Sequence, residues 1–445
     1  MKILLVSTKD QGGGAEKVAY DLALNFLSRG NDTRLLVKEK YTKGEFVFQY
    51  DPYAGNKLIE YVGGRVEKAF QLTPYFRGKP RLLELFRQLT KPKRLVDRLK
   101  GHEDFNYQYP QQMFLKQNWT PDIVHAHNLH GNYFNLNSLP NLSKQIPFIW
   151  TLHDTWAITG HCGYFINCNH WLTGCGNCPD LKRPPSILRD GTKDNWMRKQ
   201  LIYQQSKLTV VTPSKWLMNY VDESMLEPTI KKVIHNGVDT TYYKSKNKSI
   251  ARSELGLPQD RFICLFVAFG GKGENPYKDY MTVKKAIERL QRFDFYEKLL
   301  FVCIGGIKTE SNDPHYLFPG YLEREQLLKY YQSADVLLHA AIAENFPLVI
   351  LESMASGTPV IATRTGGIPE IIEDNEDGFL IEIKNHEAMA DKIHLLFKDK
   401  KLREGLSHKA SEKVNRKFSL DAQVSEYLQL FLEVKDTYPS RTIEY

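Results

Sequence analysis

Short apolar runs alternate with helical patterns along most of the chain. The first run, KILLVST at residues 2–8, precedes the glycines Gly12–Gly14, and a helical pattern then extends from Glu16 to about Arg29. The strand-like run TRLLVK follows, so this stretch predicts a strand, a glycine loop, a helix and a second parallel strand. Three later runs are compact and end in polar or small residues, which is typical of strands buried on both faces. They are PDIVHAHN, PFIWTLHD and LTVVTPS.

A second series of the same kind begins near Arg261. Its strand-like runs are RFICLFVAFG, KLLFVCIGG, DVLLHAA, TPVIATRTGG and GFLIEI, with helical patterns between them. Two consecutive series of similar size predict an α/β protein with two doubly wound, Rossmann-like domains. We expect the first domain at residues 1–235 and the second at residues 236–417. The join is expected in VIHNGVDTTYYKSKNKS, which contains an Asn-Gly turn.

The remaining segment, residues 418–445, begins with a helical pattern. FSLDAQVSEYLQLFLEV carries one apolar stripe at helical spacing. The stripe consists of Leu420, Val424, Tyr427, Leu428 and Phe431. In two-lobed enzymes such a helix can cross back to the first lobe, and this segment is a candidate for that arrangement.

Residues 77–100 are strongly basic. RGKPRLLELFRQLTKPKRLVDRLK holds nine basic and two acidic residues with leucines between them, which predicts one or two amphipathic helices inserted in the first domain. The pattern fits a solvated helical face and contact with an anionic membrane surface equally well. The formal net charge of the whole chain is +8, which also favours anionic partners such as phosphates.

We expect the protein to be located in the cytoplasm. MKILLVSTKDQGGG lacks the long apolar core of a secretory signal, and no stretch approaches the roughly eighteen apolar residues of a membrane-spanning helix. Membrane contact would then be peripheral, at the inner face of the cell membrane. No nucleic-acid partner is expected.

The segment from Glu344 to Glu352 carries the most distinctive chemistry. In ADVLLHAAIAENFPLVILESMASGTPVIATRTGGIPEII a strand ends at Ala340 or Ala341, and a helix begins near Pro347. The free N–H groups at the start of that helix suit a diphosphate. Carboxylates accept hydrogen bonds from neighbouring hydroxyls, so one of the two glutamates suits a sugar and the other a ribose. The alternative is a capped surface helix with two scattered acids.

This segment resembles the E-x7-E motif of the retaining glycosyltransferases of family 4, which adopt the two-lobed GT-B fold. Further segments resemble landmarks of that family in the same order: GGGAE, PDIVHAHN, TLHD, VTPSKW, HNGVD, Gly305 and Gly306, FPGYL and TGGIPEII. The resemblance implies two Rossmann-like domains facing across a cleft. It also implies a hexosyltransferase that moves a sugar from a UDP- or GDP-sugar donor to a glycan or lipid-linked acceptor, as in exopolysaccharide synthesis.

The resemblance implies roles for the matching residues. His153 would lie near the anomeric carbon, Glu344 would contact the sugar hydroxyls, and Lys278 would contact the diphosphate, which makes these three the candidate catalytic residues. Glu352 would hold the ribose. The other donor-binding positions would offer backbone N–H groups, permit close approach or cover the base: Gly13, Gly14, Gly320, Tyr321, Leu322, Asn345, Phe346, Pro347 and Leu348.

One stretch departs from the family pattern. An arginine usually accompanies the lysine of the diphosphate clamp, but VAFGGKGENPYKDYMTV offers only Lys272 and Lys278. Lys272 is therefore the candidate for the second charge, although a lysine lacks the bidentate fork of an arginine. The chain contains no Asp-x-Asp pair. We therefore expect lysines and a helix N-terminus, without a catalytic metal, to stabilise the leaving diphosphate.

Four of the six cysteines crowd into residues 161–180, HCGYFINCNHWLTGCGNCPD. Four thiolates at such spacings can close a tetrahedral zinc site, so a structural zinc is one hypothesis for this loop. The alternatives are reduced cysteines in an ordered loop, or two disulfides. The four candidate ligands are Cys162, Cys168, Cys175 and Cys178.

Three histidines in HAHNLH, His125, His127 and His130, also suggest a metal site. Alternation along a strand puts the first two on one face, and we favour a structural or acceptor-adjacent role for them.

Two other functions of the chain stay open. One is a nicotinamide-dependent oxidoreductase that uses GGGAE as a dinucleotide loop, although its spacing differs from G-x-G-x-x-G. The other is a non-catalytic sugar-binding module on the same fold.

Overall fold

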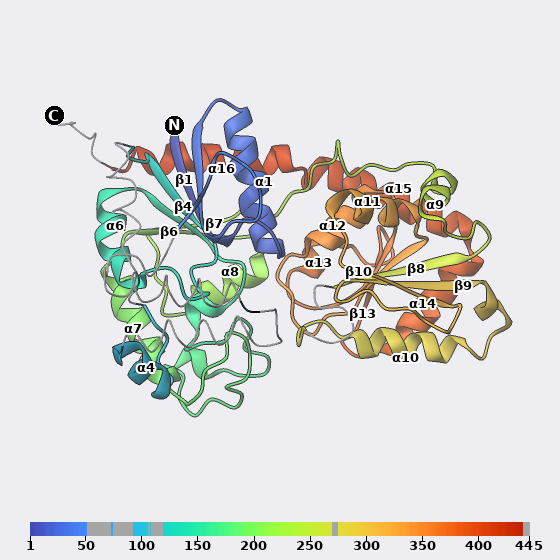
Figure 1. Cartoon of the computed structure of the whole chain (residues 1–445), viewed down its shortest axis with the longest axis horizontal. Helices are drawn as coiled ribbons and strands as arrows, with labels where there is room; N and C mark the ends of the chain where they lie inside the picture. Colours follow the sequence, from blue (N-terminus) through green and yellow to red (C-terminus); the bar gives the residue numbers. More distant parts are fainter. Residues whose placement is uncertain (51–72, 74–91, 106, 108–118, 269–274, 439–445) are drawn as a thin grey trace. The chain divides into compact units, whose positions relative to one another are not determined.

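The structure, a computed structural model, describes residues 1–50, 73, 92–105, 107, 119–268 and 275–438 (Figure 1). Its contacts divide the chain into two compact units. The first unit consists of Met1–Val211, Met218–Lys232 and Phe431–Tyr445, and the second of Thr212–Leu217 and Val233–Leu430. Lys272 and most of the basic segment 77–100 lie outside the described residues.

The first unit contains a sheet in the order β3-β2-β1-β4-β5-β6-β7. Its strands are β1 (Lys2–Lys9), β2 (Asp32–Glu39), β3 (Val47–Gln49), β4 (Ile123–Ala126), β5 (Phe148–Thr151), β6 (Leu208–Thr212) and β7 (Ile230–Val233). The described helices of this part of the chain are α1 (Gly14–Ser28), α4 (Pro92–Leu99), α6 (Leu139–Gln145), α7 (Thr192–Gln204) and α8 (Lys215–Asp222).

The centre of this sheet is β1, which pairs in parallel with β2 on one side and β4 on the other. The interior of β1 is fully apolar and buried, which suits a strand covered on both faces. Helix α1 follows through the glycine loop and buries Val18, Leu22 and Phe26, which recur at helical spacing. The predicted strand, glycine loop, helix and strand are therefore confirmed.

The second unit contains a sheet in the order β10-β9-β8-β11-β12-β13, whose strands all pair in parallel. The strands are β8 (Phe262–Val267), β9 (Leu299–Ile304), β10 (Tyr316–Gly320), β11 (Val336–His339), β12 (Val360–Thr363) and β13 (Phe379–Ile381). The helices are α9 (Lys248–Leu255), α10 (Tyr280–Leu290), α11 (Arg324–Ser333), α12 (Leu348–Ala355), α13 (Ile368–Ile371), α14 (His386–Lys398) and α15 (Lys400–Lys417). Figure 1 shows α10 and α14 on one side of this sheet and α11 and α12 on the other.

The last helix, α16 (Leu420–Lys435), begins in the second unit, and its end from Phe431 onward belongs to the first. There the ring of Phe431 lies 5.3 Å from the ring of Phe26 in α1. Four positions of the predicted apolar stripe are buried, but Leu428 is only half-buried, and Leu430 is fully buried in its place. None of the described helices combines the length and the apolar character needed to cross a membrane.

The sequence patterns miss three strands. β3 is only three residues long, and β7 reads IKKV, where lysines interrupt the apolar pattern. β10 reads YLFPG, and its proline is tolerated because β10 lies at the edge of the sheet, beside β9. The landmark FPGYL therefore contains the end of a strand and the turn that follows it.

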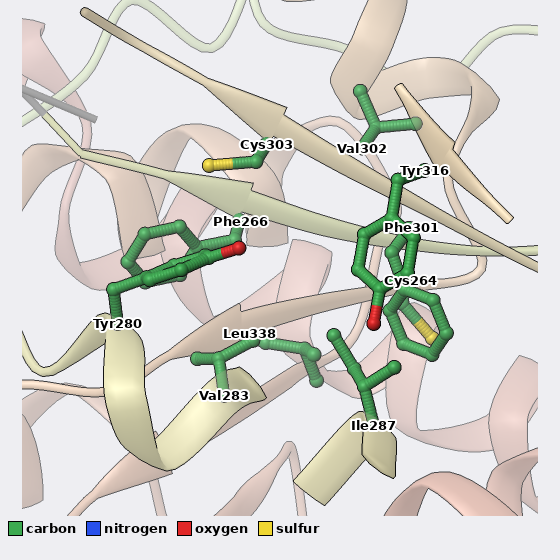
Figure 2. A pocket seen from close by; sticks show the side chains of 10 residues that line it. All are labelled: Cys264, Phe266, Tyr280, Val283, Ile287, Phe301, Val302, Cys303, Tyr316 and Leu338. Carbon is green, nitrogen blue, oxygen red and sulfur yellow. The ribbon is translucent and has the colours of Figure 1, made fainter. Parts of the chain in front are cut away.

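A small cavity lies in the apolar core of the second unit, between the sheet and α10 (Figure 2). Its lining residues come from β8, β9, β10, α10 and β11: Cys264, Phe266, Tyr280, Val283, Ile287, Phe301, Val302, Cys303, Tyr316 and Leu338. No charged side chain lines this cavity, so it has no group that would bind a diphosphate. The charged candidates lie at the ends of the strands.

Candidate functional site

In the second unit, the predicted donor-binding residues follow the carboxyl ends of the strands. The chain continues outward from β8 to β9 and β10, whereas β11 lies on the other side of β8. The strand order therefore reverses between β8 and β11, and in open parallel sheets ligands bind at such a switch point. Lys278 lies in the connection after β8, and Glu344 lies in the loop after β11.

The switch point carries a compact charged cluster. The ammonium of Lys278 forms an ion pair with Oε2 of Glu344, and the Nε2 atom of His339 lies 3.4 Å from Lys278 Nζ and 3.6 Å from Glu344 Oε2. The side chain of His339 is 1% exposed, and those of Lys278 and Glu344 are 15% and 18% exposed. Two predicted residues thus meet directly. His339 was not predicted, although a polar residue at the end of the apolar run DVLLHAA was a usable signal.

The pKa values of Glu344 and His339 are both lowered, which keeps the carboxylate charged and the imidazole neutral. Burial alone would raise the pKa of Glu344, but Lys278 and His339 together lower it to about 2. Burial is also the largest influence on His339, and with the charge of Lys278 it lowers the pKa of the imidazole to about 4. At neutral pH the cluster therefore contains a carboxylate and a neutral imidazole.

Backbone hydrogen bonds hold Lys278 beside the loop that carries Glu344. Lys278 forms an antiparallel bridge with Ala341, and the Asp279 N–H donates to the Ala340 carbonyl at 3.0 Å. The Asp279 carboxylate then caps α10 by accepting from the Thr282 N–H at 3.1 Å. The lysine is therefore positioned by both a strand end and a helix start.

The glycines of TGGIPEII support the Glu344 loop from the side of β12. Gly366 has φ +57°, and a Cβ atom there would lie 1.5 Å from the Glu344 carbonyl oxygen. A Cβ atom on Gly367 would lie 2.2 Å from the Asn345 carbonyl oxygen, which accepts a hydrogen bond from the Gly367 N–H at 2.9 Å. Only glycine permits this close approach of two backbones.

Helix α12 begins directly after this loop, with Pro347 as its N-cap residue. The side chains of Asn345 and Phe346 contact the protein: Asn345 Oδ1 accepts from Ser214 Oγ at 2.5 Å, and the Phe346 ring stacks on His235. These contacts fix the two side chains on the protein beside the N–H groups at the start of the helix, and their role at the donor stays a prediction. Glu352 is 3% exposed and accepts a hydrogen bond from the hydroxyl of Tyr331 at 2.9 Å.

The residues expected near the base meet at the ends of β9 and β10. The Gly305 N–H donates to the Gly320 carbonyl at 2.8 Å, and the Tyr321 N–H donates to the Gly306 carbonyl at 3.0 Å. Gly320 has φ +84°, and a Cβ atom there would lie 2.7 Å from the Lys308 nitrogen. The side chain of Tyr321 is 57% exposed, so it is accessible to a ligand.

In the first unit, histidines gather after β4 and β5. His127 Nδ1 lies 2.9 Å from His153 Nε2, and His125 Nε2 lies 2.8 Å from the hydroxyl of Thr151. Burial lowers the pKa of His153 to about 4 and that of His125 to about 3, and it lowers the pKa of His127 well below its usual value. All three imidazoles are therefore neutral at physiological pH.

An ion pair lies beside these neutral imidazoles. His130 Nε2 lies 2.9 Å from Asp154 Oδ2. Burial would lower the pKa of His130, but Asp154 and Glu16 raise it above its usual value. The Glu16 carboxylate folds back over the glycine loop, and a Cβ atom on Gly13 would lie 2.3 Å from its Oε2 atom. This network links the glycine loop after β1 to the His153 turn after β5.

The predicted zinc site in the cysteine-rich loop stays a prediction. Within the described residues, no group of three or more histidine, cysteine or acidic side chains could hold a metal ion. The thiols instead make separate contacts: Cys175 Sγ accepts from the Gly160 N–H at 3.2 Å, and Cys178 Sγ lies 3.3 Å from His161 Nε2. Cys162, Cys168, Cys175 and Cys178 are all free, and burial raises the pKa of Cys162 to about 12. Reduced cysteines in an ordered loop are what the structure contains.

Two family profiles match consecutive parts of the chain. The profile described as Glycosyltransferase Family 4 matches residues 12–242, which is more than half of the chain, and the profile described as Glycosyl transferases group 1 matches residues 247–413. These matches leave the nicotinamide-dependent oxidoreductase without support. They cover both units and all described candidate residues.

Individual proteins show the same similarity. The putative colanic acid biosynthesis glycosyl transferase WcaC of Escherichia coli is 24% identical over 84% of this chain and 85% of its own length. The D-inositol 3-phosphate glycosyltransferase of Corynebacterium glutamicum is 28% identical over 70% of this chain and 72% of its own length.

Solved structures share the fold at lower identity. Sucrose-phosphate synthase from Thermosynechococcus elongatus has a TM-score of 0.67 at 18% identity and covers 98% of this chain and 99% of its own. Anabaena HepE, solved in complex with UDP-glucose, has a TM-score of 0.60 at 17% identity and covers 98% of this chain and 100% of its own.

Proposed function

The chain belongs to glycosyltransferase family 4 and has the GT-B fold, and from this premise we propose that it transfers a sugar from a nucleotide-sugar donor to a glycan or lipid-linked acceptor with retention of the anomeric configuration. The observation that carries the proposal is the charged cluster of Lys278, Glu344 and His339 at the switch point of the second sheet. HepE, which shares the fold, was solved with UDP-glucose, and this supports a nucleotide sugar as the donor.

The donor is proposed to bind across the strand ends of the second unit. Lys278 and the N–H groups at the start of α12 would bind the diphosphate, because both supply positive charge without a metal. Glu344 would accept hydrogen bonds from sugar hydroxyls, and its ionised state at neutral pH suits that role. Glu352 would bind the ribose, which requires its hydrogen bond with Tyr331 to be shared or exchanged.

Transfer breaks the bond between the anomeric carbon and the phosphate oxygen. The acceptor hydroxyl oxygen forms the new bond to that carbon on the same face, and its proton passes to the leaving phosphate oxygen. Negative charge develops on the diphosphate in this step, and a fixed lysine and helix N-terminus stabilise it in place of a divalent ion. Because the sequence contains no Asp-x-Asp pair, we propose that catalysis is metal-independent.

The acceptor is proposed to bind in the first unit, near His153 and the pair formed by His130 and Asp154. The name of the Escherichia coli relative refers to colanic acid biosynthesis, which favours an acceptor in polysaccharide synthesis. Helix α4 presents Val96 and Leu99 to solvent beside basic residues, which is compatible with an anionic membrane surface. We propose peripheral contact of that kind.

The test is a donor panel. The purified chain is incubated with UDP- and GDP-sugars in EDTA. Transfer or donor hydrolysis is measured through the nucleoside diphosphate that is released. At least one donor is expected to turn over, and the product linkage, determined by NMR, is expected to keep the donor's anomeric configuration. Inversion at the anomeric carbon would contradict the retaining mechanism, and turnover only with an added divalent ion would contradict metal independence.

A further inference from the structure

The hydrogen bond between two neutral histidines in the first unit constrains where their protons lie. His127 Nδ1 and His153 Nε2 are 2.9 Å apart, their ring planes differ by 18°, and their ring centroids are 5.2 Å apart. The centroid separation is about the N···N distance plus one ring radius, roughly 1.1 Å, at each end, so the contact lies close to the plane of both rings, which is good hydrogen-bond geometry. A neutral imidazole has one N–H and one lone pair, so one ring donates and the other accepts.

The second ring nitrogen of His127 decides which ring donates. His127 is 0% exposed, and among the described residues its Nε2 atom has no hydrogen-bond partner. If His127 carried its proton on Nε2, a buried N–H would stay unpaired while Nδ1 accepted from His153. If it carries the proton on Nδ1, only a lone pair stays unpaired, and unpaired buried acceptors are less rare in proteins than unpaired buried N–H groups.

We infer that His127 is a positioning residue: its Nδ1–H donates to His153 Nε2 and thereby keeps the proton of His153 on Nδ1. The Nδ1–H group of His153 then points away from His127 as a donor. Protonation of His153 at Nε2 would set two N–H groups against each other, so this imidazole is a poor base. Within the proposed function, on which this last step rests, His153 donates a hydrogen bond to an oxygen of the substrate and does not remove the acceptor proton.

Burial lowers the pKa of His153 to about 4, so the imidazole is neutral at pH 7, as this assignment requires. His125 offers a contrast on the same strand. Its ring centroid lies 4.3 Å from that of His127, but its Nε2 atom bonds to the hydroxyl of Thr151. Replacement of His125 therefore disturbs the packing of His127 without removing the hydrogen bond to His153.

The first test needs no substitution in His127. The full chain, labelled with ¹⁵N-histidine, is examined by long-range ¹H–¹⁵N NMR at pH 7, and the His153 signals are identified by their loss in His153→Ala. Nδ1 of His153 is expected at the shift of a protonated nitrogen and Nε2 at that of an unprotonated one. A proton on Nε2 would overturn the inference. The spectrum does not depend on turnover, so the absence of transferase activity would refute the proposed function and leave this result standing.

The second test separates hydrogen bonding from packing. Asparagine can place an N–H near the position of Nδ1, so His127→Asn is expected to keep the His153 tautomer and stay within about 3-fold of the wild-type kcat. His127→Leu removes the donor, should move the His153 proton toward Nε2, and should lower kcat roughly 10- to 100-fold with little change in donor KM. His125→Asn is the control and should leave the tautomer unchanged. Equal kcat losses in both His127 variants with an unchanged His153 tautomer would show a purely structural role.

Discussion

The two units share one strand order but carry different chemistry at its switch point. In each sheet the first strand, β1 or β8, lies at the centre, and the fourth, β4 or β11, lies beside it on the side opposite the second. The second unit places an ion pair there, Lys278 with Glu344. The first unit places neutral imidazoles there, with His127 bonded to His153.

The difference teaches that the fold supplies a position and the side chains supply the function. A buried charge is costly unless it is paired, so Glu344 compensates the charge of Lys278, and under the proposed function a diphosphate would take over this pairing. Neutral imidazoles cannot neutralise a diphosphate, but they donate and accept hydrogen bonds in fixed directions, which suits hydroxyl groups. The comparison therefore assigns charge neutralisation to the second unit and hydroxyl positioning to the first.

The largest expected effect comes from removing the charge of Glu344. Glu344→Gln should lower kcat/KM for the donor roughly 100- to 1000-fold, because it removes the negative charge and one of the two acceptor oxygens of the carboxylate and leaves Lys278 without its ionic partner. Steady-state transfer with the best donor of the panel measures the change. Glu325→Gln, on the exposed side of α11, is the matched control and should be neutral. A loss below about 3-fold in Glu344→Gln would break the assignment of charge chemistry to this cluster.

The next effect tests whether the two units act separately. His153→Ala should lower kcat roughly 10- to 100-fold, whereas the affinity for free UDP or GDP should change less than about 2-fold, because His153 belongs to the first unit. Kinetics and calorimetric titration of the free nucleotide give the two values. His408→Ala, on the exposed side of α15, is the control. An equal loss of nucleotide affinity in His153→Ala would contradict the assignment of nucleotide binding to the second unit alone.

A smaller effect concerns how rigidly the charged cluster is held. Gly366→Ala should lower the free energy of unfolding by about 2 kcal/mol more than Gly256→Ala, as measured by urea denaturation. Both glycines have similar positive φ values, +57° and +66°, but a Cβ atom on Gly256 meets nothing within 4 Å, whereas on Gly366 it collides with the Glu344 carbonyl. If both variants lose the same free energy of unfolding, the Glu344 loop rearranges to accept the Cβ atom, and the backbone contact does not fix Glu344.

The last prediction is a pH dependence of stability, which does not depend on a ligand. His125 and His153 have folded-state pKa values of about 3 and about 4, below the unfolded value of 6.5, so the unfolded chain binds more protons between these values. Stability should therefore fall as pH drops from 6.5 toward 4, by about 1.4 kcal/mol per pH unit for each histidine. The raised pKa of His130 acts in the opposite sense, because its contribution is lost as pH rises. Denaturant titrations at pH 7, 6 and 5 measure the slope, and equal or greater stability at pH 5 than at pH 7 would contradict it.

The sequence was most informative where a pattern is local. Compact apolar runs predicted most strands of both sheets, since strands buried on both faces are apolar throughout. The motif from Glu344 to Glu352 predicted a helix start after a strand, and α12 begins where its proline indicated. Lys278 and Glu344 were both identified and meet in the structure.

The missed features depend on contacts between distant segments. His339 lies in the cluster because β11 ends beside the connection after β8, and no local spacing encodes that contact. The side chains of Asn345 and Phe346 contact Ser214 and His235 from a remote part of the chain, and no local pattern shows these contacts. The zinc hypothesis for the four cysteines stays a prediction for the same reason, since cysteine spacing does not determine which groups the thiols face.

The most direct test of the central claim is calorimetric titration of UDP-glucose and a GDP-sugar, in EDTA, into the wild-type chain, Lys278→Ala and Lys284→Ala. Lys284 lies six residues further on, in α10, and forms an exposed ion pair with Glu288 at 3.7 Å, so its replacement should leave binding intact. The wild type should bind one of the two donors without metal, and Lys278→Ala should weaken that binding by roughly 100-fold or more. Wild-type affinity in Lys278→Ala would contradict the assignment of the diphosphate to the charged cluster of the second unit.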